Sequence, residues 1–260
     1  MKSILGKVIF RVSRRLLSKF GYEINLGTSS ILYPELSERE IGFIRQIFVQ
    51  SLTMTSFDSL CTLAIACKSL SREKVLGDYV EVGIWRGGSS LVAKMFLSER
   101  KFYLYDTYAG MTNPSEFDFR IGGKDNRDTL EKWESGQKSG HNEWVFASLD
   151  QVKENFRSFN LLDSSVNFVK GDVRETLTSE SVPNEIALLR LDTDFYDSTL
   201  VELQVLWPRL VKNGILILDD YGHWDGARKA VDEFFGQLGH EGMFMIPISG
   251  GGGRVIVKNH

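Results

Sequence analysis

Short apolar runs alternate with helix-length amphipathic segments along the chain after residue 78. Strands covered on both faces read as apolar runs, whereas helices repeat apolar residues every three or four positions. This alternation predicts right-handed crossovers and a mostly parallel sheet with helices on both faces. The predicted strands are Tyr79–Val82, Phe102–Tyr105, Val166–Val169, Ile186–Leu191, Ile215–Leu218, Phe244–Ile246 and Val255–Val257.

The last two predicted strands are joined by the glycine run Gly250–Gly253, which predicts a turn and an antiparallel hairpin. We therefore expect an α/β fold of the Rossmann-like kind, with a mostly parallel seven-stranded sheet that ends in an antiparallel C-terminal hairpin. The helices predicted between the first five strands include Ser89–Leu97, Leu149–Phe159 and Ser198–Leu210.

Two regions depart from the alternating pattern. Residues 35–50 and 55–72 repeat apolar residues with helical spacing, so we expect an N-terminal helical extension over 1–72 and the sheet-based core over 73–260. Residues 108–147 are polar and glycine-rich, and a long irregular insertion of this kind is typical of a lid or binding loop. Aromatic residues within it favour a packed lid over a disordered loop: Phe117, Phe119, Trp133 and Trp144.

Composition narrows the class of protein. Apolar residues make up 42% and charged residues 25%, as in an ordinary globular protein, and a net charge of -3 gives no indication of a nucleic-acid partner. No apolar run reaches the roughly 18 residues that span a bilayer. Cys61 and Cys67 lie in an apolar helical stretch at a spacing that fits neither a metal nor a redox motif, so we expect buried structural thiols. A cytoplasmic location is the expectation.

The first 20 residues form a basic amphipathic pattern without acidic residues. A helix of this kind can lie on an anionic membrane surface, so peripheral membrane contact by residues 1–20 is one interpretation. The other is an accessory helix that packs on its own domain or on a second copy of the chain. Charges interrupt the apolar residues, which excludes a signal peptide.

The first predicted strand runs into a glycine turn and a helix start at Gly83, Gly87 and Gly88. Ligands of open α/β sheets bind at such strand ends, and glycines let the backbone approach them closely. The spacing is not that of a dinucleotide site, and Glu81 would repel a pyrophosphate but suits the cationic amino-acid end of S-adenosylmethionine. A purely structural turn with a solvated acid is the alternative. Ser89 or Ser90 is expected to cap the helix.

Two further strand ends point to an adenosine-like ligand. Asp106 ends the second predicted strand, where an acid can accept hydrogen bonds from a ribose diol. Gly171 and Asp172 follow the third, a position that suits the adenine end, although Gly-Asp is also a common turn. Neither feature separates one adenosine-containing cofactor from another.

The fourth and fifth predicted strands each end in two acids. If these strands are neighbours, four carboxylates converge beside the glycine turn and repel one another unless a cation or proton intervenes. Hard oxygen ligands select Mg²⁺, Mn²⁺ or Ca²⁺. Unrelated helix-capping acids are one alternative, and the Asp-x-Asp motif of a metal-dependent glycosyltransferase is another. The four acids are Asp192, Asp194, Asp219 and Asp220.

Taken together, these segments resemble the macrocin O-methyltransferase family, which includes metal-dependent sugar O-methyltransferases of antibiotic pathways. The resemblance runs from about residue 50 to the C-terminus. It is carried by residues 80–88, Tyr105-Asp106-Thr107-Tyr108-Ala109-Gly110-Met111, the segment 148–156, Leu189-Arg190-Leu191-Asp192-Thr193-Asp194-Phe195-Tyr196-Asp197-Ser198-Thr199, Leu218-Asp219-Asp220-Tyr221-Gly222 and residues 227–232.

The resemblance implies a class I methyltransferase fold, S-adenosylmethionine as cofactor and Mg²⁺ as metal. It implies that Asp192, Asp219 and Asp220 hold the metal and that Asp194 is the general base. Residues 113–145 do not match the antibiotic enzymes, so the acceptor is a small molecule or glycan with a sugar diol that the resemblance does not specify. The implied cofactor-binding positions are Thr53, Met54, Glu81, Gly83, Trp85, Arg86, Gly87, Gly88, Ser89, Asp106, Thr107, Ser148, Gly171 and Asp172.

Three functional alternatives remain at this point. A catechol-type O-methyltransferase would use the same metal chemistry on an aromatic diol, and a glycosyltransferase would bind a nucleotide sugar instead of S-adenosylmethionine. A non-catalytic scaffold on the same fold would have no need of the four acids. The resemblance also leads us to expect a homo-oligomer.

Overall fold

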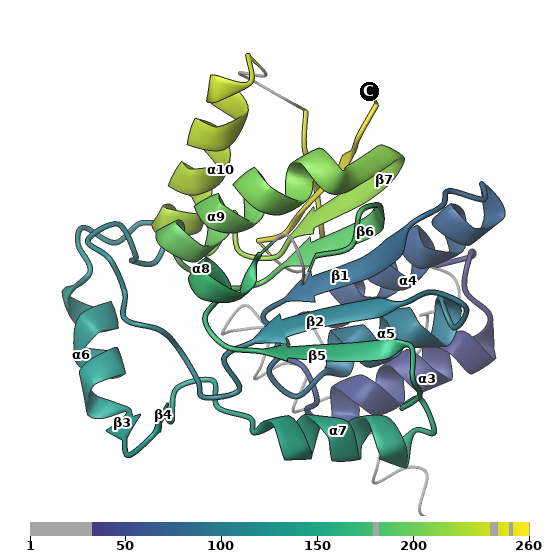
Figure 1. The fold of residues 1–260 in the computed structure, drawn as a ribbon, viewed down its shortest axis with the longest axis horizontal. Coiled ribbons are helices and arrows are strands. Elements are labelled where there is room, and N and C mark those ends of the chain that lie inside the picture. Colours follow the sequence, from purple (N-terminus) through teal and green to yellow (C-terminus); the bar gives the residue numbers. More distant parts are fainter. Residues whose placement is uncertain (1–32, 179–181, 240–243, 250–251, 260) are drawn as a thin grey trace, which may run out of the picture. The chain divides into compact units, whose positions relative to one another are not determined.

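The computed structural model of the protein describes residues 33–178, 182–239, 244–249 and 252–259 (Figure 1). The basic segment 1–20 and its expected membrane contact lie outside the described residues. The chain divides into two compact units between Ile41 and Gly42. The predicted division into a helical extension and a core is a different one and stays a prediction.

The main sheet has seven strands in the order β5-β2-β1-β6-β7-β9-β8, which confirms the predicted fold class. The first five strands in this order pair in parallel, and β9 is antiparallel to both β7 and β8. Strand order therefore reverses between β1 and β6, where ligands of open α/β sheets bind. The strands are β1 Asp78–Val82, β2 Phe102–Asp106, β5 Val166–Lys170, β6 Ile186–Leu191, β7 Leu210–Leu218, β8 Ile246–Pro247 and β9 Arg254–Val257.

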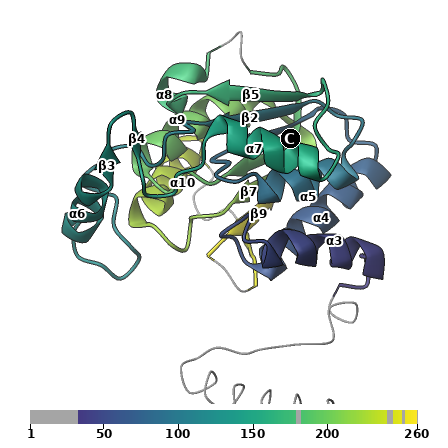
Figure 2. The same ribbon diagram turned by 90° about the horizontal axis from the view of Figure 1, so that it is seen from below.

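Helices cover both faces of this sheet. Helices α4, α5 and α7 lie on one face, and α9 and α10 lie on the other (Figures 1 and 2). Every residue of β6 is buried, as a central strand between two helical layers requires. The helices are α3 Glu38–Val49, α4 Phe57–Arg72, α5 Gly88–Phe96, α6 Arg127–Ser135, α7 Leu149–Ser158, α8 Val173–Thr176, α9 Tyr196–Leu206 and α10 Asp225–Gln237, with a 3-10 turn at Trp207–Arg209.

Three predicted elements differ from the structure. The strand expected over Ile215–Leu218 begins at Leu210, which the sequence did not predict because the exposed Lys212 and Asn213 interrupt its apolar run. The helix expected over Ser198–Leu210 ends at Leu206, because Pro208 lacks an amide hydrogen and is accommodated in a 3-10 turn before Leu210 begins β7. The strand expected over Phe244–Ile246 is only Ile246–Pro247, since β9 offers partners to these two residues alone. The predicted hairpin of β8 and β9 is confirmed.

The insertion at residues 108–147 is more regular than expected. It contains α6 and a small hairpin of β3 Gln137–Lys138 and β4 His141–Asn142. Only Thr129 of α6 is buried, so the helix has no apolar stripe from which the sequence could have predicted it. The expected packing of its aromatic residues is present: Phe117 contacts Tyr196 edge-on, and Trp144 packs against Phe195 and Trp224.

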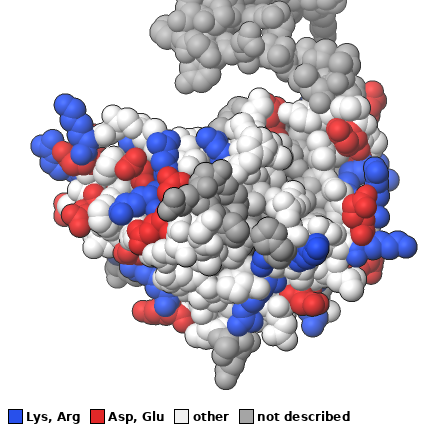
Figure 3. All heavy atoms as spheres, turned by 90° about the horizontal axis from the view of Figure 1, so that it is seen from above, with Lys and Arg blue, Asp and Glu red and all other residues white. Residues whose placement is uncertain are grey.

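Other expectations concern burial and charge. Cys61 and Cys67 are buried and unpaired, as predicted. None of the helices that the structure describes is long and apolar enough to cross a membrane. On the face shown in Figure 3, basic side chains are interspersed with acidic ones instead of forming a single basic surface.

Candidate active site

A cavity of about 540 Å³ lies at the carboxyl ends of the central strands, within the unit Gly42–His260. Its wall combines the loops after β1, β2, β6 and β7 with residues 48–59 before the sheet and with the insertion. This volume lies in the range of small-molecule and cofactor pockets. The cavity therefore occupies the place where strand order reverses, as the sequence predicts.

The glycine turn after β1 brings two loops into contact. Gly83 has a φ of 85°, and a Cβ atom at this position would lie 1.9 Å from the carbonyl oxygen of Asp192. Only glycine fits both the conformation and this approach. The turn is fixed from β2, because the carboxylate of Asp106 accepts hydrogen bonds from the amides of Ile84 (2.7 Å) and Trp85 (2.9 Å).

Asp106 also lines the cavity, as expected of a residue that contacts a bound nucleoside. Its other oxygen accepts a hydrogen bond of 2.7 Å from the amide of Tyr108. Burial raises the pKa of this carboxyl group, and the backbone amides oppose that effect. A carboxylate oxygen can accept more than one hydrogen bond, so the side chain can brace the turn and still bind a ribose hydroxyl.

Glu81 does not line the cavity, contrary to the expectation that it contacts a ligand directly. Its side chain is fully buried and accepts hydrogen bonds from the hydroxyls of Tyr79 (2.7 Å), Ser89 and Ser90. The hydroxyls of Ser89 and Ser90 therefore bond to Glu81 and do not cap α5, although one of them was predicted to do so. The N-cap residue of α5 is Gly87, and no side chain caps the helix. Through these hydrogen bonds the buried carboxylate of Glu81 links β1 to the start of α5 and stabilises the glycine turn between them.

Arg190 connects Glu81 to the acids at the cavity. Its guanidinium group is 2% exposed and donates to Glu81 (2.7 Å), to Asp192 (2.8 Å) and to Asp219 (2.8 Å). Burial disfavours its charge, but the three carboxylates outweigh burial and raise its pKa well above the usual value. Arg190 was not among the predicted site residues, although it is the single charge within the apolar run of β6 and was therefore a signal.

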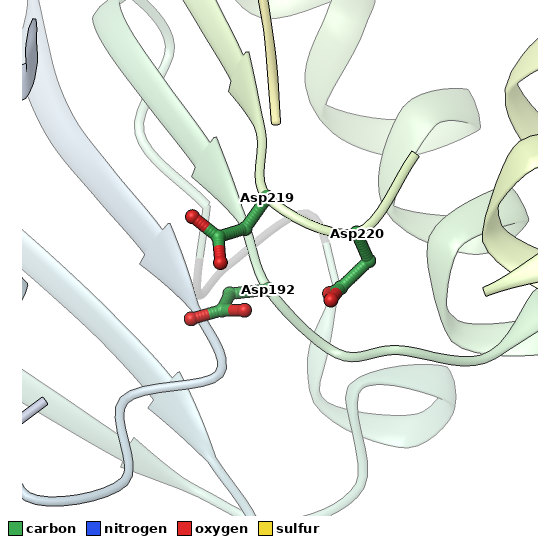
Figure 4. A group of neighbouring side chains, drawn as sticks. All are labelled: Asp192, Asp219 and Asp220. Atoms are coloured by element: carbon green, nitrogen blue, oxygen red, sulfur yellow. The ribbon is translucent and has the colours of Figure 1, made fainter. Parts of the chain in front are cut away.

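Three of the four predicted acids form a group that suits a metal ion. Asp192 follows β6, Asp219 and Asp220 follow β7, and one carboxylate oxygen from each lies within 4.8 Å of the others (Figure 4). Burial raises the pKa of Asp192 and Asp220 well above the usual value; repulsion from neighbouring aspartates adds to this, and Arg190 opposes it at Asp192. A divalent cation would relieve this repulsion, and three carboxylates are a donor set for a hard ion such as Mg²⁺.

Asp194 lies next to this group but is not part of it. It has a φ of 67°, and its amide donates a hydrogen bond of 3.0 Å to Asp220. Burial, with the nearby charge of Asp192, raises the pKa of its carboxyl group to about 6. A carboxylate with this pKa is a better proton acceptor than an ordinary aspartate.

The remaining predicted cofactor positions fall into two sets. Besides Gly83 and Asp106, the cavity wall includes Thr53, Met54, Trp85, Ser89, Thr107 and Asp172. Arg86, Gly87, Gly88, Ser148 and Gly171 lie off the wall. Their local roles explain this: Arg86 donates to the carbonyl of Ser51, Gly87 and Ser148 precede helices, Gly88 packs against Leu52, and Gly171 bonds to the carbonyl of Asp106.

Several residues on the wall were not predicted. Thr55 donates hydrogen bonds of 2.8 and 3.0 Å to the carboxylate of Asp219. The insertion contributes Arg120, Lys132 and Trp144. No spacing pattern in the sequence marks them as cavity residues, because Thr55 and the three insertion residues reach the cavity only through the tertiary fold.

The architecture is that of the class I methyltransferases. The structure of the O-methyltransferase NovP superposes with a TM-score of 0.69 at 26% identity, covering 80% of this chain and 82% of that one. The calicheamicin methyltransferase CalS11 superposes with a TM-score of 0.53 at 17% identity, covering 91% and 99%, and supports the fold alone. The same fold also occurs in a Bacillus cereus O-methyltransferase complexed with S-adenosylhomocysteine, with a TM-score of 0.52 at 13% identity, covering 89% of this chain and 95% of that one.

The sequence identifies the family within this class. The family model for macrocin O-methyltransferase (TylF) matches residues 30–246, and the chain belongs to this family. A tetracenomycin-C rhamnosyl 4'-O-methyltransferase from Streptomyces olivaceus is 32% identical over 72% of this chain and 69% of its own length. Demethyldecarbamoylnovobiocin O-methyltransferase from Streptomyces niveus is 29% identical over 70% and 67%. The protein is thus an S-adenosylmethionine-dependent O-methyltransferase.

Proposed function

We propose that the protein transfers a methyl group from S-adenosylmethionine to a sugar hydroxyl and that the reaction depends on Mg²⁺. The observation that carries the proposal is the placement of Asp194 beside the group Asp192, Asp219 and Asp220. A relative from Streptomyces olivaceus is named for methylation of a rhamnosyl group, and one from Micromonospora griseorubida is a mycinamicin III 3''-O-methyltransferase, 30% identical over 70% of this chain.

The reaction breaks a carbon–sulfur bond and the hydroxyl O–H bond, and it forms a carbon–oxygen bond and an O–H bond on the base. The oxygen of the sugar hydroxyl attacks the methyl carbon as the carbon–sulfur bond breaks, and the hydroxyl proton passes to the carboxylate of Asp194. The products are the methyl ether and S-adenosylhomocysteine. Mg²⁺, when bound, supplies positive charge that orients the hydroxyl and lowers its pKa.

Different residues would bind the metal, bind the cofactor and exclude solvent. Asp192, Asp219 and Asp220 would hold the metal, and Thr55 and Arg190 fix the rotamer of Asp219 by hydrogen bonds. Asp106 and the turn at Gly83 would hold the nucleoside. The insertion would close the cavity from solvent, which suits a reaction that competes with water.

Methyl transfer to a panel of sugar acceptors, measured with radiolabelled S-adenosylmethionine, tests the proposal. We expect transfer that is lost on chelation, restored by Mg²⁺ and reduced at least about a hundredfold in Asp194→Asn, since general-base catalysis contributes about that factor. Transfer to catechols but to no sugar would contradict the sugar assignment. Undiminished transfer in the presence of chelator would contradict the metal.

Three further expectations join this proposal. We propose a cytoplasmic location, self-association and a lid function for residues 108–147. Cell fractionation, light scattering of the purified protein and protease protection of the insertion by S-adenosylhomocysteine test them in turn.

A further inference from the structure

One wall of the cavity carries two basic residues from the insertion, Arg120 and Lys132. The guanidinium carbon of Arg120 lies 4.1 Å from the centre of the Trp224 ring, and Nζ of Lys132 lies 4.3 Å from the centre of the Trp144 ring. The two rings are themselves in contact, with centres 6.0 Å apart. The two cations therefore flank one continuous aromatic surface.

Among the described residues, these cations lack the carboxylate partners that two other basic residues of the insertion have. Arg127 pairs with Asp125 at 2.9 Å and Lys138 with Glu143 at 3.8 Å. Among the residues that the structure describes, neither Arg120 nor Lys132 has a carboxylate within ion-pair distance. An aromatic face attracts a cation without neutralising it, so both groups keep N–H donors for an anion.

The position of Arg120 is fixed by the fold. Its backbone pairs with that of Trp224, and the amide of Ile121 donates a hydrogen bond of 3.0 Å to the carbonyl of His223. Trp224 is 2% exposed and packs against Phe195. A cation held in this way loses little side-chain entropy when it binds a ligand.

Arg120 and the proposed base Asp194 both line this cavity. The anion-binding wall and the reacting hydroxyl are thus neighbours within one cavity. One acceptor bound in this cavity can therefore place a hydroxyl at Asp194 and an anionic group at Arg120 and Lys132. Both basic side chains are exposed, so their charges are accessible to a ligand that enters the cavity.

We propose that the acceptor is a phosphorylated sugar, with its phosphate or pyrophosphate bound by Arg120 and Lys132 and its hydroxyl placed at Asp194. A guanidinium group binds phosphate oxygens in a bidentate manner, and an ammonium group adds a point charge, so the pair suits a group with several anionic oxygens. The inference rests on the proposed function and specifies its substrate class. The phosphate has two sources, a nucleoside diphosphate sugar or a simpler sugar phosphate ester.

Isothermal titration of the full chain, saturated with S-adenosylhomocysteine and Mg²⁺, tests the inference. The probes are UDP-glucose, glucose 1-phosphate and the neutral methyl α-glucoside. We expect at least one of the two phosphates to bind about tenfold or more tightly than methyl α-glucoside, and the double variant Arg120→Gln/Lys132→Gln to lose at least about tenfold of that affinity. Tight binding of UDP-glucose alone would indicate that the acceptor is a nucleoside diphosphate sugar. Equal binding of UDP-glucose and glucose 1-phosphate would indicate that the phosphate itself is recognised.

Lys124→Gln is the matched control, since Lys124 is an exposed lysine of the same insertion that does not line the cavity. It should bind both phosphates within about twofold of the wild type. An unchanged unfolding temperature of the double variant would show that it folds. Unaltered phosphate binding in that double variant, or binding of methyl α-glucoside as tight as that of the phosphates, would overturn the inference.

Methyl-transfer assays on the same acceptors separate the two proposals. Transfer to a neutral glycoside with no binding of either phosphate would leave the proposed function standing and reject the anionic acceptor. Phosphate binding that depends on Arg120 and Lys132, without transfer to any sugar, would retain the anion site and reject the sugar assignment.

Discussion

The hydroxyl of Thr193 donates a hydrogen bond of 2.8 Å to Oε1 of Glu202. Thr193 lies between a proposed metal ligand and the proposed base, and Glu202 projects from α9 beneath this loop. Glu202 is fully buried, and its Oε2 atom has no hydrogen-bond partner among the described residues. Burial raises the pKa of Glu202 to about 8, against a smaller opposing effect of the bond from Thr193. The side chain is therefore mostly protonated at neutral pH.

This pKa predicts how stability depends on pH. The usual pKa of 4.5 applies to the unfolded chain, so between that value and about 8 the folded state binds the extra proton. The contribution of Glu202 to the free energy of unfolding therefore falls as pH rises, by about 1.4 kcal/mol per pH unit as an upper limit. Glu202→Gln keeps an acceptor for Thr193 but cannot ionise. Its stability relative to the wild type should rise from pH 5 to pH 8 in urea unfolding.

A stability difference between Glu202→Gln and the wild type that stays constant across this pH range would contradict the prediction. Glu233→Gln provides a control, because Glu233 lies on α10, is only half-buried and has a cationic partner, Lys229, at 3.5 Å. Its effect on the free energy of unfolding should not change with pH in the same window.

Gly83→Ala should destabilise the protein far more than Gly122→Ala. Both glycines have a φ of 85°, so both substitutions carry the strain of a left-handed residue, about 1 to 2 kcal/mol. Only at position 83 would the new methyl group also meet the backbone of Asp192, whereas nothing lies within 4 Å at position 122. Urea unfolding of both variants measures the difference, and equal losses would show that the contact with Asp192 is unimportant.

Arg190→Met should lower the free energy of unfolding by about 3 to 5 kcal/mol, because removal of one partner leaves buried charge without compensation. Glu81, fully buried, would lose its only cationic partner among the described residues. Glu81→Gln in the same chain should recover part of the loss. Arg209→Met is a suitable comparison, since among the described residues Arg209 donates hydrogen bonds only to backbone carbonyls.

An Arg190→Met variant that unfolds within about 1 kcal/mol of the wild type would contradict this account of the buried charges. The Arg209→Met loss should stay near about 1 kcal/mol, the value of an ordinary hydrogen bond.

Asp192→Asn, Asp219→Asn and Asp220→Asn should each weaken metal binding by at least about tenfold while S-adenosylhomocysteine still binds. Each change removes one anionic ligand from a group of three. Titration with Mn²⁺, followed by electron paramagnetic resonance, measures the metal directly and does not depend on turnover. Asp150→Asn, on the exposed surface of α7, should bind Mn²⁺ like the wild type. Normal Mn²⁺ affinity in all three cluster variants would exclude the site.

The sheet and the acid cluster were predictable because simple rules govern both. Central strands such as β6 are buried on both faces and read as apolar runs, and parallel strands place their carboxyl ends at one edge of the sheet. Asp192 and Asp219 were therefore expected to meet. Neither rule predicts which side chains pack beneath these acids in the interior of the protein.

These rules could not predict the hydrogen-bond partners of Glu81. Its position suggested contact with a ligand, whereas its side chain points toward Ser89, Ser90 and Arg190. A strand alternates its side chains between two faces, and which face meets the cavity depends on how the following turn bends. For the insertion the reason differs: α6 buries too little apolar surface to leave a periodic signal.

The antiparallel strand β9 has a consequence for synthesis of the protein. Strand β9 pairs with β7, and Asp219 follows the end of β7. Just before β9, the carbonyl of Gly252 accepts a hydrogen bond of 2.8 Å from the amide of Gly222, and the amide of Gly252 donates one of 3.0 Å to the His223 ring. Residues 252–257 leave the ribosome after every other part of this sheet. The nascent chain can therefore fold its earlier strands first, but the catalytic edge is completed only when this final segment has emerged.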